Sequence, residues 1–348
     1  MAVVTGPVLG QGIIPSGQIG TELTYLTRRG FIPKLIVQIY NSTPLMAALI
    51  GNSQPAMGGI SSVSVPIQTS SATTPQWSGF DGSFTSPGYQ AFANLAEFDL
   101  KLNICPIPFL GMEGIVQLNH AIIPRLEAVM DDATNNTMLS MTNAIYYNGS
   151  GVAPFATTNT QAFTGLPAAI DSGSTVDIYG NISRAATPTW ASTVYNASNA
   201  AASRQLMLQW IAGTVKAGGA MPNFAICGMG TWTLLAQDFV GQESYQITPG
   251  QSFTRTADGP ESAFQALMVA GVPVYCDPYC PEGTIYILNM DYLSLYIHEQ
   301  ASFSFTGFES TLPNWQVGYI GALLTVAELV CTKPISSTQV QSVGYLSL

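Results

Sequence analysis

The sequence predicts an α+β protein organised around one long helix. From Gly111 to Gly149, apolar residues recur at helical spacing in two adjacent stripes, the pattern of a helix whose wide apolar face lies on a core. Upstream, in 60–104, apolar and polar residues alternate with the period of two that is typical of half-exposed strands. Downstream, short helix and strand patterns follow one another without repeats and without a βαβ series, which favours an α+β arrangement.

The long helix is predicted to be a strut. Its first stripe consists of Ile115, Leu118, Ile122, Leu126, Val129, Ala133, Met141 and Ala144. At a rise of about 1.5 Å per residue, about 35 residues would span roughly 50 Å. Because proline removes a backbone donor and clashes with the preceding turn, we expect a kink or a restart at Pro124. Asn148-Gly149 predicts the end, since glycine accepts a left-handed cap.

Two alternating runs predict the strands of a long hairpin. In the first, Val63, Val65 and Ile67 alternate with Ser62, Ser64 and Pro66; in the second, Ala96, Phe98, Leu100, Leu102 and Ile104 alternate with Glu97, Asp99, Lys101 and Asn103. The stretch 70–89 between them is rich in turn residues, and such a long loop is uncommon unless it binds something. Trp77, Phe80 and Phe84 at its tip are aromatic residues of the kind that anchor interfaces. The alternative is that they fold back on their own hairpin.

The remaining segments give shorter signals. Residues 1–25 are predicted to be an extended arm, and 31–50 an arm that ends in a short helix. After the strut, an amphipathic helix is expected over 203–217, with Leu206, Leu208, Ile211 and Val215 on its apolar side. The further expected elements are a strand at 224–227, a helix at 231–239, three strands within 268–300 and an apolar run at 319–331.

The charge content limits the classes of partner. Only 9% of the residues are charged, so the surface must be largely polar-uncharged and apolar, which suits a chain covered by neighbours. An extracellular β-protein with a polar, uncharged surface would have the same composition. The net charge of −10 and ten scattered basic residues, with Arg28-Arg29 as the one adjacent pair, argue against a nucleic-acid grip.

Targeting and cysteine patterns indicate an intracellular protein. The N-terminus has no basic segment before an apolar core, and no uncharged apolar run reaches the ~18 residues of a membrane span. We therefore expect a soluble, cytoplasmic chain. The five cysteines are scattered and odd in number, so free and mostly buried thiols are expected, and the two histidines make a zinc site improbable.

One short motif resembles an enzyme loop. Ala168-Ala169-Ile170 leads into Asp171-Ser172-Gly173-Ser174, like the aspartic-protease loop. That chemistry needs two carboxylates that share a proton, and no second such loop occurs. No nucleophile elbow, phosphate loop or metalloprotease motif is present in the sequence. We therefore expect no catalytic residue, no cofactor and no metal site.

Three stretches of the sequence, taken together with their order and spacing, form a pattern. They are Gly165-Leu166 followed by Tyr179-Gly180-Asn181-Ile182-Ser183-Arg184 and Trp190; Gly271-Val272-Pro273-Val274 with Asp277-Pro278, Pro281-Glu282-Gly283 and Ile287-Leu288-Asn289; and Leu323 to Pro334. With the hairpin and the strut before them, they resemble the major capsid proteins of tailed double-stranded DNA bacteriophages, which have the Hong Kong 97-type fold. Asn181 stands where the family's Tyr-Gly-Gly-Ile-x-Arg pattern commonly has a second glycine.

The resemblance implies a fold and a function. The Hong Kong 97-like capsid fold would comprise an N-terminal arm (1–50), an extended β-hairpin loop (51–110), a peripheral domain with the spine helix (111–164 and 306–348) and an axial domain (165–305). The chain would be a non-enzymatic structural protein of the virion that self-assembles as hexamers and pentamers into an icosahedral head around the DNA genome. The alternative is a secreted β-rich binding or adhesion module.

The resemblance also implies partners and residues. The partners would be further copies of the chain and separate scaffolding, portal and decoration proteins, with assembly in the host cytoplasm, weak contact with DNA and no membrane. Candidates for contacts between subunits are Trp77, Phe80, Phe84, Arg28 and Arg29; the structural motif positions are Gly165, Leu166, Tyr179, Gly180, Arg184, Trp190, Gly271, Pro273 and Asn289. Some members of this fold join subunits by Lys–Asn isopeptide bonds, but the tip 69–90 has no lysine, so we expect none here.

Overall fold

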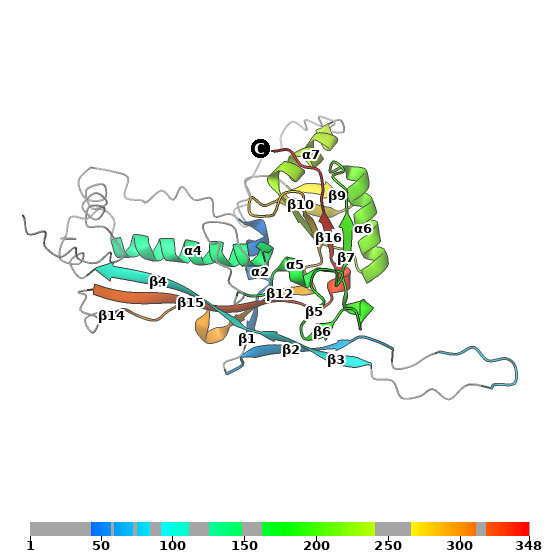
Figure 1. Cartoon of the computed structure of the whole chain (residues 1–348), viewed down its shortest axis with the longest axis horizontal. Helices are drawn as coiled ribbons and strands as arrows, with labels where there is room; N and C mark the ends of the chain where they lie inside the picture. Colours follow the sequence, from blue (N-terminus) through cyan, green and yellow to red (C-terminus); the bar gives the residue numbers. More distant parts are fainter. Residues whose placement is uncertain are drawn as a thin grey trace, which may run out of the picture. The chain divides into compact units, whose positions relative to one another are not determined.

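The computed structural model describes residues 43–56, 59–71, 75–83, 92–110, 125–147, 162–240, 266–310 and 318–347 (Figure 1). The chain divides into two compact units. Unit 1 consists of 1–41, 103–139 and 301–325, and unit 2 of 42–102, 140–300 and 326–348. These units divide the chain at other residues than the four predicted domains, whose assignments remain predictions. The predicted N-terminal arm lies outside the described residues as far as residue 42.

The described elements follow the predicted order of hairpin, long helix and mixed helices and strands. In chain order they are α2 (Pro44–Gly51), β1 (Gln54–Ala56), β2 (Ser62–Gln68), β3 (Ala93–Asp99), β4 (Lys101–Leu110), α4 (Arg125–Tyr147), α5 (Leu166–Ala169), β5 (Ile178–Tyr179), β6 (Ile182–Ser183), β7 (Thr193–Asn196), α6 (Arg204–Gly218), β8 (Phe224–Cys227), α7 (Met229–Val240), β9 (Leu267–Val269), β10 (Val272–Cys276), β11 (Ile285–Leu288), β12 (Leu293–His298), β13 (Ser304–Phe305), β14 (Glu309–Ser310), β15 (Gly318–Cys331) and β16 (Thr338–Gln341). The α+β prediction is confirmed.

Unit 1 contains the first parts of the long helix α4 and of the long strand β15, up to residues 139 and 325. Ile107 of β4, Ala133 of α4 and Leu323 of β15 form a buried apolar cluster, with Val129 of α4 packed against it. Because Val129 and Ala133 are four residues apart, they lie on one face of the helix, as the predicted stripe requires. Helix α4 is described from Arg125, one residue after Pro124, and the rest of the predicted strut (111–124 and 148–149) lies outside the described residues.

The hairpin ladder forms as predicted. Strands β2 and β3 pair antiparallel, with Val63 opposite Phe98 and Val65 opposite Ala96. Since opposed residues of an antiparallel pair point to the same side, these apolar side chains share one face of the two-stranded ribbon. The other face carries polar residues such as Glu97.

The prediction of one continuous second strand is wrong at Leu100. Strand β3 ends before it, and β4 begins after it and pairs with β15 rather than with β2. Leu102 and Ile104, which were expected to continue the apolar face, are 52% and 53% exposed, whereas Ile107 is buried. The break shifts the alternation by one residue, because each strand keeps its period of two but packs on a different core.

Unit 2 contains a six-stranded sheet in the order β7-β16-β11-β8-β10-β9. One face, which includes Ala225 and Ile287, packs in a single buried cluster with Met207 and Trp210 of α6 and Leu235 of α7. In Figure 1, α6 runs beside β7 and β16, and α7 lies next to β10. The sequence predicted β8 and the strands of 268–300, and these are the strands that position the motif segments.

Helix α6 was predicted with nearly correct bounds but a displaced apolar face. Ser203 caps its start by accepting a hydrogen bond from the Leu206 N–H, and Gly219 ends it in the left-handed conformation. The predicted Leu208 is 40% exposed, and Met207 and Thr214 are buried in its place. The buried face is therefore rotated by about one residue, because the sheet selects the side that also carries Trp210.

Membrane insertion has no support among the helices described. None of them is long and apolar enough to cross a bilayer.

Candidate functional site: the hairpin and the motif cluster

The tip of the hairpin presents two bare aromatic side chains. Trp77 is 104% exposed and Phe80 is 113% exposed, so neither packs on its own hairpin. The Gly82 N–H donates to the Gly79 carbonyl, which makes a tight turn beside Phe80. Large apolar side chains that are fully exposed in a single chain are typical of surfaces that a partner covers. The other contact candidates, Phe84, Arg28 and Arg29, lie outside the described residues.

The root of the hairpin, in contrast, is held by the turn that joins β5 and β6. This turn is Tyr179–Ile182, and its Gly180 and Asn181 both have positive φ, 57° and 63°. Both strands of the turn belong to unit 2, as does the hairpin ribbon. The Glu97 N–H of β3 donates to the Gly180 carbonyl at 3.1 Å. The turn therefore joins the hairpin by a main-chain bond.

Tyr179 connects this turn to the body of unit 2. Its ring meets Phe98 edge-on, with 5.0 Å between centroids, and stacks on Trp190 at 5.8 Å. The Trp190 indole N–H donates to the Tyr179 carbonyl, and the Tyr179 hydroxyl accepts a bond from the Cys331 N–H at the end of β15. Burial is the main cause that raises the pKa of Tyr179. This buried, neutral side chain is thus the centre of the motif.

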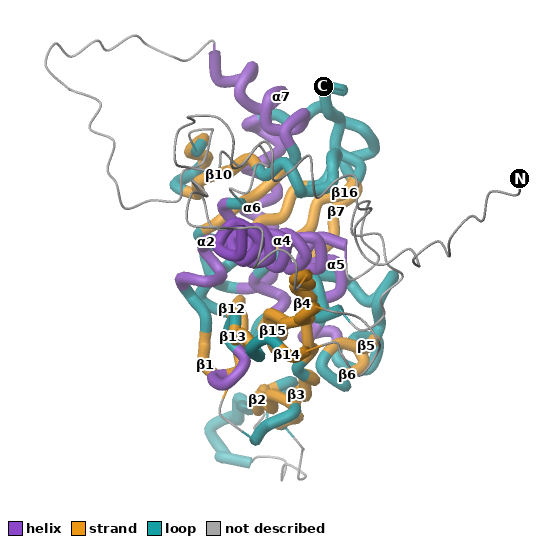
Figure 2. The backbone as a smooth tube through the Cα atoms, turned by 90° about the vertical axis from the view of Figure 1, so that its left-hand side faces the viewer, coloured by secondary structure: helices purple, strands orange, loops and turns teal. Residues whose placement is uncertain are grey.

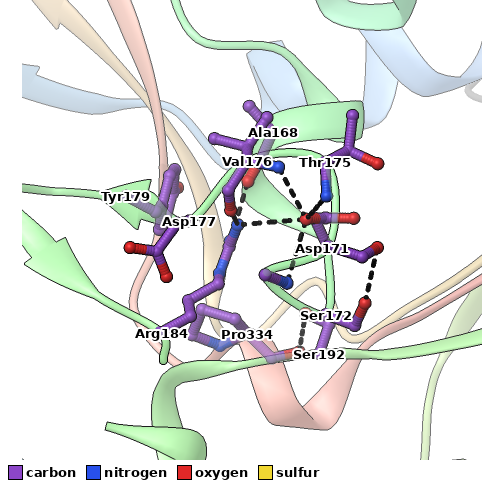
Figure 3. Close-up of polar contacts among 12 residues, drawn as sticks. Ala168, Asp171, Ser172, Thr175, Val176, Asp177, Tyr179, Arg184, Ser192 and Pro334 are labelled. Atoms are coloured by element: carbon purple, nitrogen blue, oxygen red, sulfur yellow. Dashed lines mark hydrogen bonds and ion pairs between the residues drawn. The ribbon is translucent and has the colours of Figure 1, made fainter. Parts of the chain in front are cut away.

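Arg184 is buried in the same cluster (Figure 3). Its guanidinium donates to the carbonyls of Val176, Ala168 and Ala169 at 2.7 to 2.9 Å. It also lies over the Tyr179 ring at 5.0 Å. The two carbonyls from α5 belong to a helix end, where orphan acceptors favour a cation. Burial lowers the pKa of Arg184, and the nearby carboxylate of Asp171 opposes this shift.

Asp171 has a structural place in the loop that resembles a protease motif. Its Oδ2 accepts the backbone N–H groups of Gly173, Thr175 and Val176 and lies 4.0 Å from the Arg184 Nη1. Figure 3 shows the carboxylate and the guanidinium pointing toward each other. A carboxylate oxygen that accepts three backbone N–H groups beside a buried guanidinium is held in one geometry. This arrangement folds the 171–176 loop and does not present an acid to a substrate.

Gly165 and Leu166 fasten the start of this segment. Gly165 is the N-cap of α5, and a Cβ there would lie 2.5 Å from the Ala144 carbonyl oxygen and 2.6 Å from that of Ile145. No side chain fits at that distance. Leu166 is fully buried. The two residues therefore dock the motif segment on the last turns of α4.

The remaining motif positions lie in the strand region of unit 2. Gly271 occupies the β9–β10 turn with a φ of 82°, and Pro273 is opposite Met268 in the β9–β10 pair. Asn289 follows β11 and is buried, with its side-chain amide donating to the Met221 carbonyl and its Oδ1 accepting the Asp291 N–H. The structure brings Tyr179, Gly180, Arg184 and Trp190 together and leaves these three positions apart from that cluster.

Two buried carboxyl groups had no distinguishing signal in the sequence. Glu328 of β15 accepts the Thr164 N–H with Oε1, while its Oε2 has no partner among the described residues. Burial raises the pKa of Glu328 to about 7, although the Thr164 N–H and Lys101 lower it. Asp277 accepts the Tyr146 hydroxyl with one oxygen and the Tyr279 N–H with the other, and burial raises its pKa to about 6.

The cysteines are as predicted. All five are free, and Cys227, Cys276, Cys280 and Cys331 are buried. Burial raises the pKa of these four thiols, so they are poor nucleophiles. In the part of the chain that the structure describes, no group of histidine, cysteine and acidic side chains is arranged to hold a metal ion.

Comparison with solved structures identifies the fold. The capsid of cyanophage A-1(L) matches with a TM-score of 0.67 and 16% identity, over 92% of this chain and 99% of the other. The capsid of a native GTA particle matches with 0.57 and 9% identity, over 95% and 100%. The holo-SrpI encapsulin complex from Synechococcus elongatus matches with 0.56 and 10% identity, over 94% and 98%. No sequence family and no curated protein matches the chain.

The chain has the Hong Kong 97-type capsid fold. The resemblance to capsid proteins of tailed phages is confirmed by these neighbours, which also include the capsid of Myoviridae phage XM1. The matches extend over more than nine-tenths of both chains, so the likeness involves the whole capsid fold and not one shared motif. At such low identity they establish the fold, and the roles of single residues remain to be argued from the contacts above.

Proposed function

We propose that this chain is the major capsid protein of a tailed double-stranded DNA bacteriophage. It assembles as hexamers and pentamers into the icosahedral head that encloses the genome. The observation that carries the proposal is the end-to-end match to capsid subunits. The bare Trp77 and Phe80 support it, since a subunit of a shell has neighbours to cover such residues.

The proposed domains follow the capsid fold. Residues 1–50 serve as the arm, 51–110 as the extended loop that overlaps a neighbouring subunit, 111–164 and 306–348 as the peripheral domain, and 165–305 as the axial domain. The net charge of −10 supports weak contact with packaged DNA. Separate scaffolding, portal and decoration proteins complete the particle, which assembles in the host cytoplasm.

Electron microscopy of the purified, expressed protein tests this proposal. We expect closed shells, tubes or ring-shaped capsomers. A protein that stays monomeric at high concentration, with a normal melting transition, would overturn the proposal and revive the alternative of a binding or adhesion module. That alternative is disfavoured by the capsid neighbours.

A second candidate is an encapsulin-type shell, favoured by the full-length match to the SrpI complex. The two candidates differ in the content of the particle. Particles from the natural source that contain long double-stranded DNA support the phage head. DNA-free shells from that source favour the encapsulin-type role.

A further inference from the structure

We propose that the Tyr179–Ile182 turn is a seat that sets the direction of the hairpin, with Gly180 as the positioning residue. The consequence is that this turn controls the geometry of the shell through the direction of the hairpin. The inference rests on the proposed function, because it assumes that the hairpin reaches a second copy. It concerns two parts of unit 2, because Gly180 and Phe98 are 82 residues apart in the sequence.

The first argument is the closeness of the turn to the ribbon. A Cβ built on Gly180 would lie 2.7 Å from the Phe98 Cζ and 3.1 Å from the Ala96 Cβ. Both ribbon residues are buried, and the Phe98 ring packs edge-on against Tyr179, so a side chain at residue 180 would displace packed atoms. Together with the bond from the Glu97 N–H to the Gly180 carbonyl, the contact places the turn against the apolar face of β3. The absence of a side chain at residue 180 permits this approach.

The second argument is a separate attachment further along the same ribbon. The Thr189 hydroxyl donates to the Thr69 carbonyl at 2.9 Å, just beyond the end of β2. The Thr69 N–H donates to the Phe92 carbonyl, which holds the two strands together at that level. Two attachments at different points fix the direction of a ribbon, whereas one would act as a pivot. Both views show β5 and β6 beside the ribbon (Figures 1 and 2).

The third argument is the length of the lever. Trp77 follows Val65, the residue opposite Ala96, by twelve positions. At about 3.3 Å per residue of extended chain, the tip lies up to about 40 Å beyond the seat. A small displacement at the seat is therefore multiplied at the tip. In a closed shell, the rotation between neighbours decides whether the assembly closes and at what size.

Gly180→Ala tests the seat, and Gly219→Ala is its matched control. Both glycines have positive φ, 57° and 69°, so alanine has a similar backbone penalty at either site. A Cβ on Gly219 meets nothing within 4 Å, whereas one on Gly180 meets Phe98. Phe98→Leu removes the Phe98 atoms that the new Cβ would meet, so the double variant should recover.

Two measurements separate the seat from the shell. Hydrogen exchange of the 93–99 peptide reports the bond between the Glu97 N–H and Gly180, and particle diameters by electron microscopy report shell geometry. For Gly180→Ala we expect at least tenfold faster exchange in that peptide, unchanged exchange at 224–227, and at least a tenfold loss of shells of wild-type diameter. Gly219→Ala should match the wild type, and Gly180→Ala with Phe98→Leu should restore both readouts.

Each other outcome has a defined meaning. Wild-type diameters and yields for Gly180→Ala, an equal defect in Gly219→Ala, or no recovery in the double variant would overturn the inference. If Gly180→Ala does not fold, Thr189→Val is the deciding variant. The Thr189 side chain is exposed, and the substitution removes its hydrogen bond to the Thr69 carbonyl. Shells of mixed diameter would support the seat, and shells of normal diameter would refute it. If the wild type forms no assembly, the proposed function fails, while hydrogen exchange still tests the seat within the subunit.

Discussion

The Arg184 cluster and the hairpin tip differ in whether their side chains find partners within the chain. Arg184 is buried and bonded to three carbonyls of its own chain, and the aromatic rings beside it are also buried. Trp77 and Phe80 are fully exposed at the tip. The cluster finds its partners within one chain, except that the buried Arg184 Nε has no hydrogen-bond partner among the described residues, whereas nothing covers the two tip aromatics. The difference predicts that folding depends on the first region and the proposed assembly on the second.

Deleting residues 70–88 is the test of this comparison with the largest expected effect. The variant keeps the whole β2–β3 ladder, which ends at Gln68 opposite Ala93, so the subunit should fold and remain soluble. It should form no shells, because the tip is gone. Electron microscopy and a melting curve measure the two effects. A collapsed melting transition would place the hairpin in the subunit's own core and break the comparison.

Replacing the tip aromatics alone sharpens the same test. Trp77→Ser with Phe80→Ser keeps the length of the loop and removes its apolar anchors. We expect the same melting temperature and a strong loss of shells. Normal shells from this variant together with none from the deletion would show that the loop acts by its backbone.

Arg184→Met should affect the subunit itself. It removes three hydrogen bonds and leaves Asp171 without its cation, a type of loss that costs about 3–5 kcal/mol. We expect a melting temperature lower by roughly 10 °C. Arg204→Met at an exposed helix start is the control and should cost much less, because the charge interactions of an exposed arginine contribute at most about 1 kcal/mol. Equal melting temperatures for the two variants would contradict the structural role of the cluster.

Glu328→Gln should change the pH dependence of stability. The pKa of Glu328 is about 7 in the folded chain against 4.5 for the free group. Between these pH values the folded protein holds a proton that the unfolded chain has released, so stability decreases as the pH rises through this window. The effect amounts to at most roughly 3 kcal/mol.

Glutamine keeps an acceptor for the Thr164 N–H and has no charge to bury. The variant should therefore melt a few degrees higher than the wild type at pH 8 and equally at pH 5. Asp277→Asn is the contrast, because both Asp277 oxygens accept hydrogen bonds and an amide offers one acceptor. It should lose stability at both pH values. A wild-type pH profile for Glu328→Gln would show that this carboxyl group is not desolvated.

Reductant and boiling in detergent should have the smallest effects, on the melting of shells and on the size of the band in a gel. All five cysteines are free, so shells should melt alike with and without reductant. Boiling in SDS should give a single band near 36.9 kDa, because no lysine lies in the tip. A ladder that survives reductant would point to Lys101, which interacts electrostatically with Glu328. Lys101→Arg would then abolish the ladder.

Local patterns predicted the elements better than their faces. Helix α6 was found from its amphipathic spacing and strand β8 from a short apolar run, since these signals depend on neighbours in the sequence. The break at Leu100 could not be found from the sequence, because apolar and polar residues alternate on both sides of it. Which of them are buried reverses only because β3 and β4 pack on different cores. The same holds for Leu208, which the sheet of unit 2 leaves exposed.

The motif predicted which residues matter and not why. Gly180 was singled out within a turn, but its contact is with Phe98, a residue 82 positions earlier in the chain. Asp171 lies in a segment that resembles a protease loop and was expected not to be catalytic, but the sequence did not predict its partners, which are three backbone N–H groups and Arg184. Glu328 resembled any acidic residue in an apolar strand. These properties arise from burial, which no short pattern contains.

The sparse and partly buried charge also determines how ionic strength should act. Dissolved ions screen exposed charges over about 10 Å at 0.1 M salt and about 3 Å at 1 M, and they act much less on a buried pair such as Asp171 and Arg184. Each subunit has a formal charge of −10, so neighbouring subunits repel one another. Added salt weakens that repulsion and leaves the internal pair unchanged. Concentrated salt should thus promote association while the melting temperature of an isolated subunit stays nearly constant.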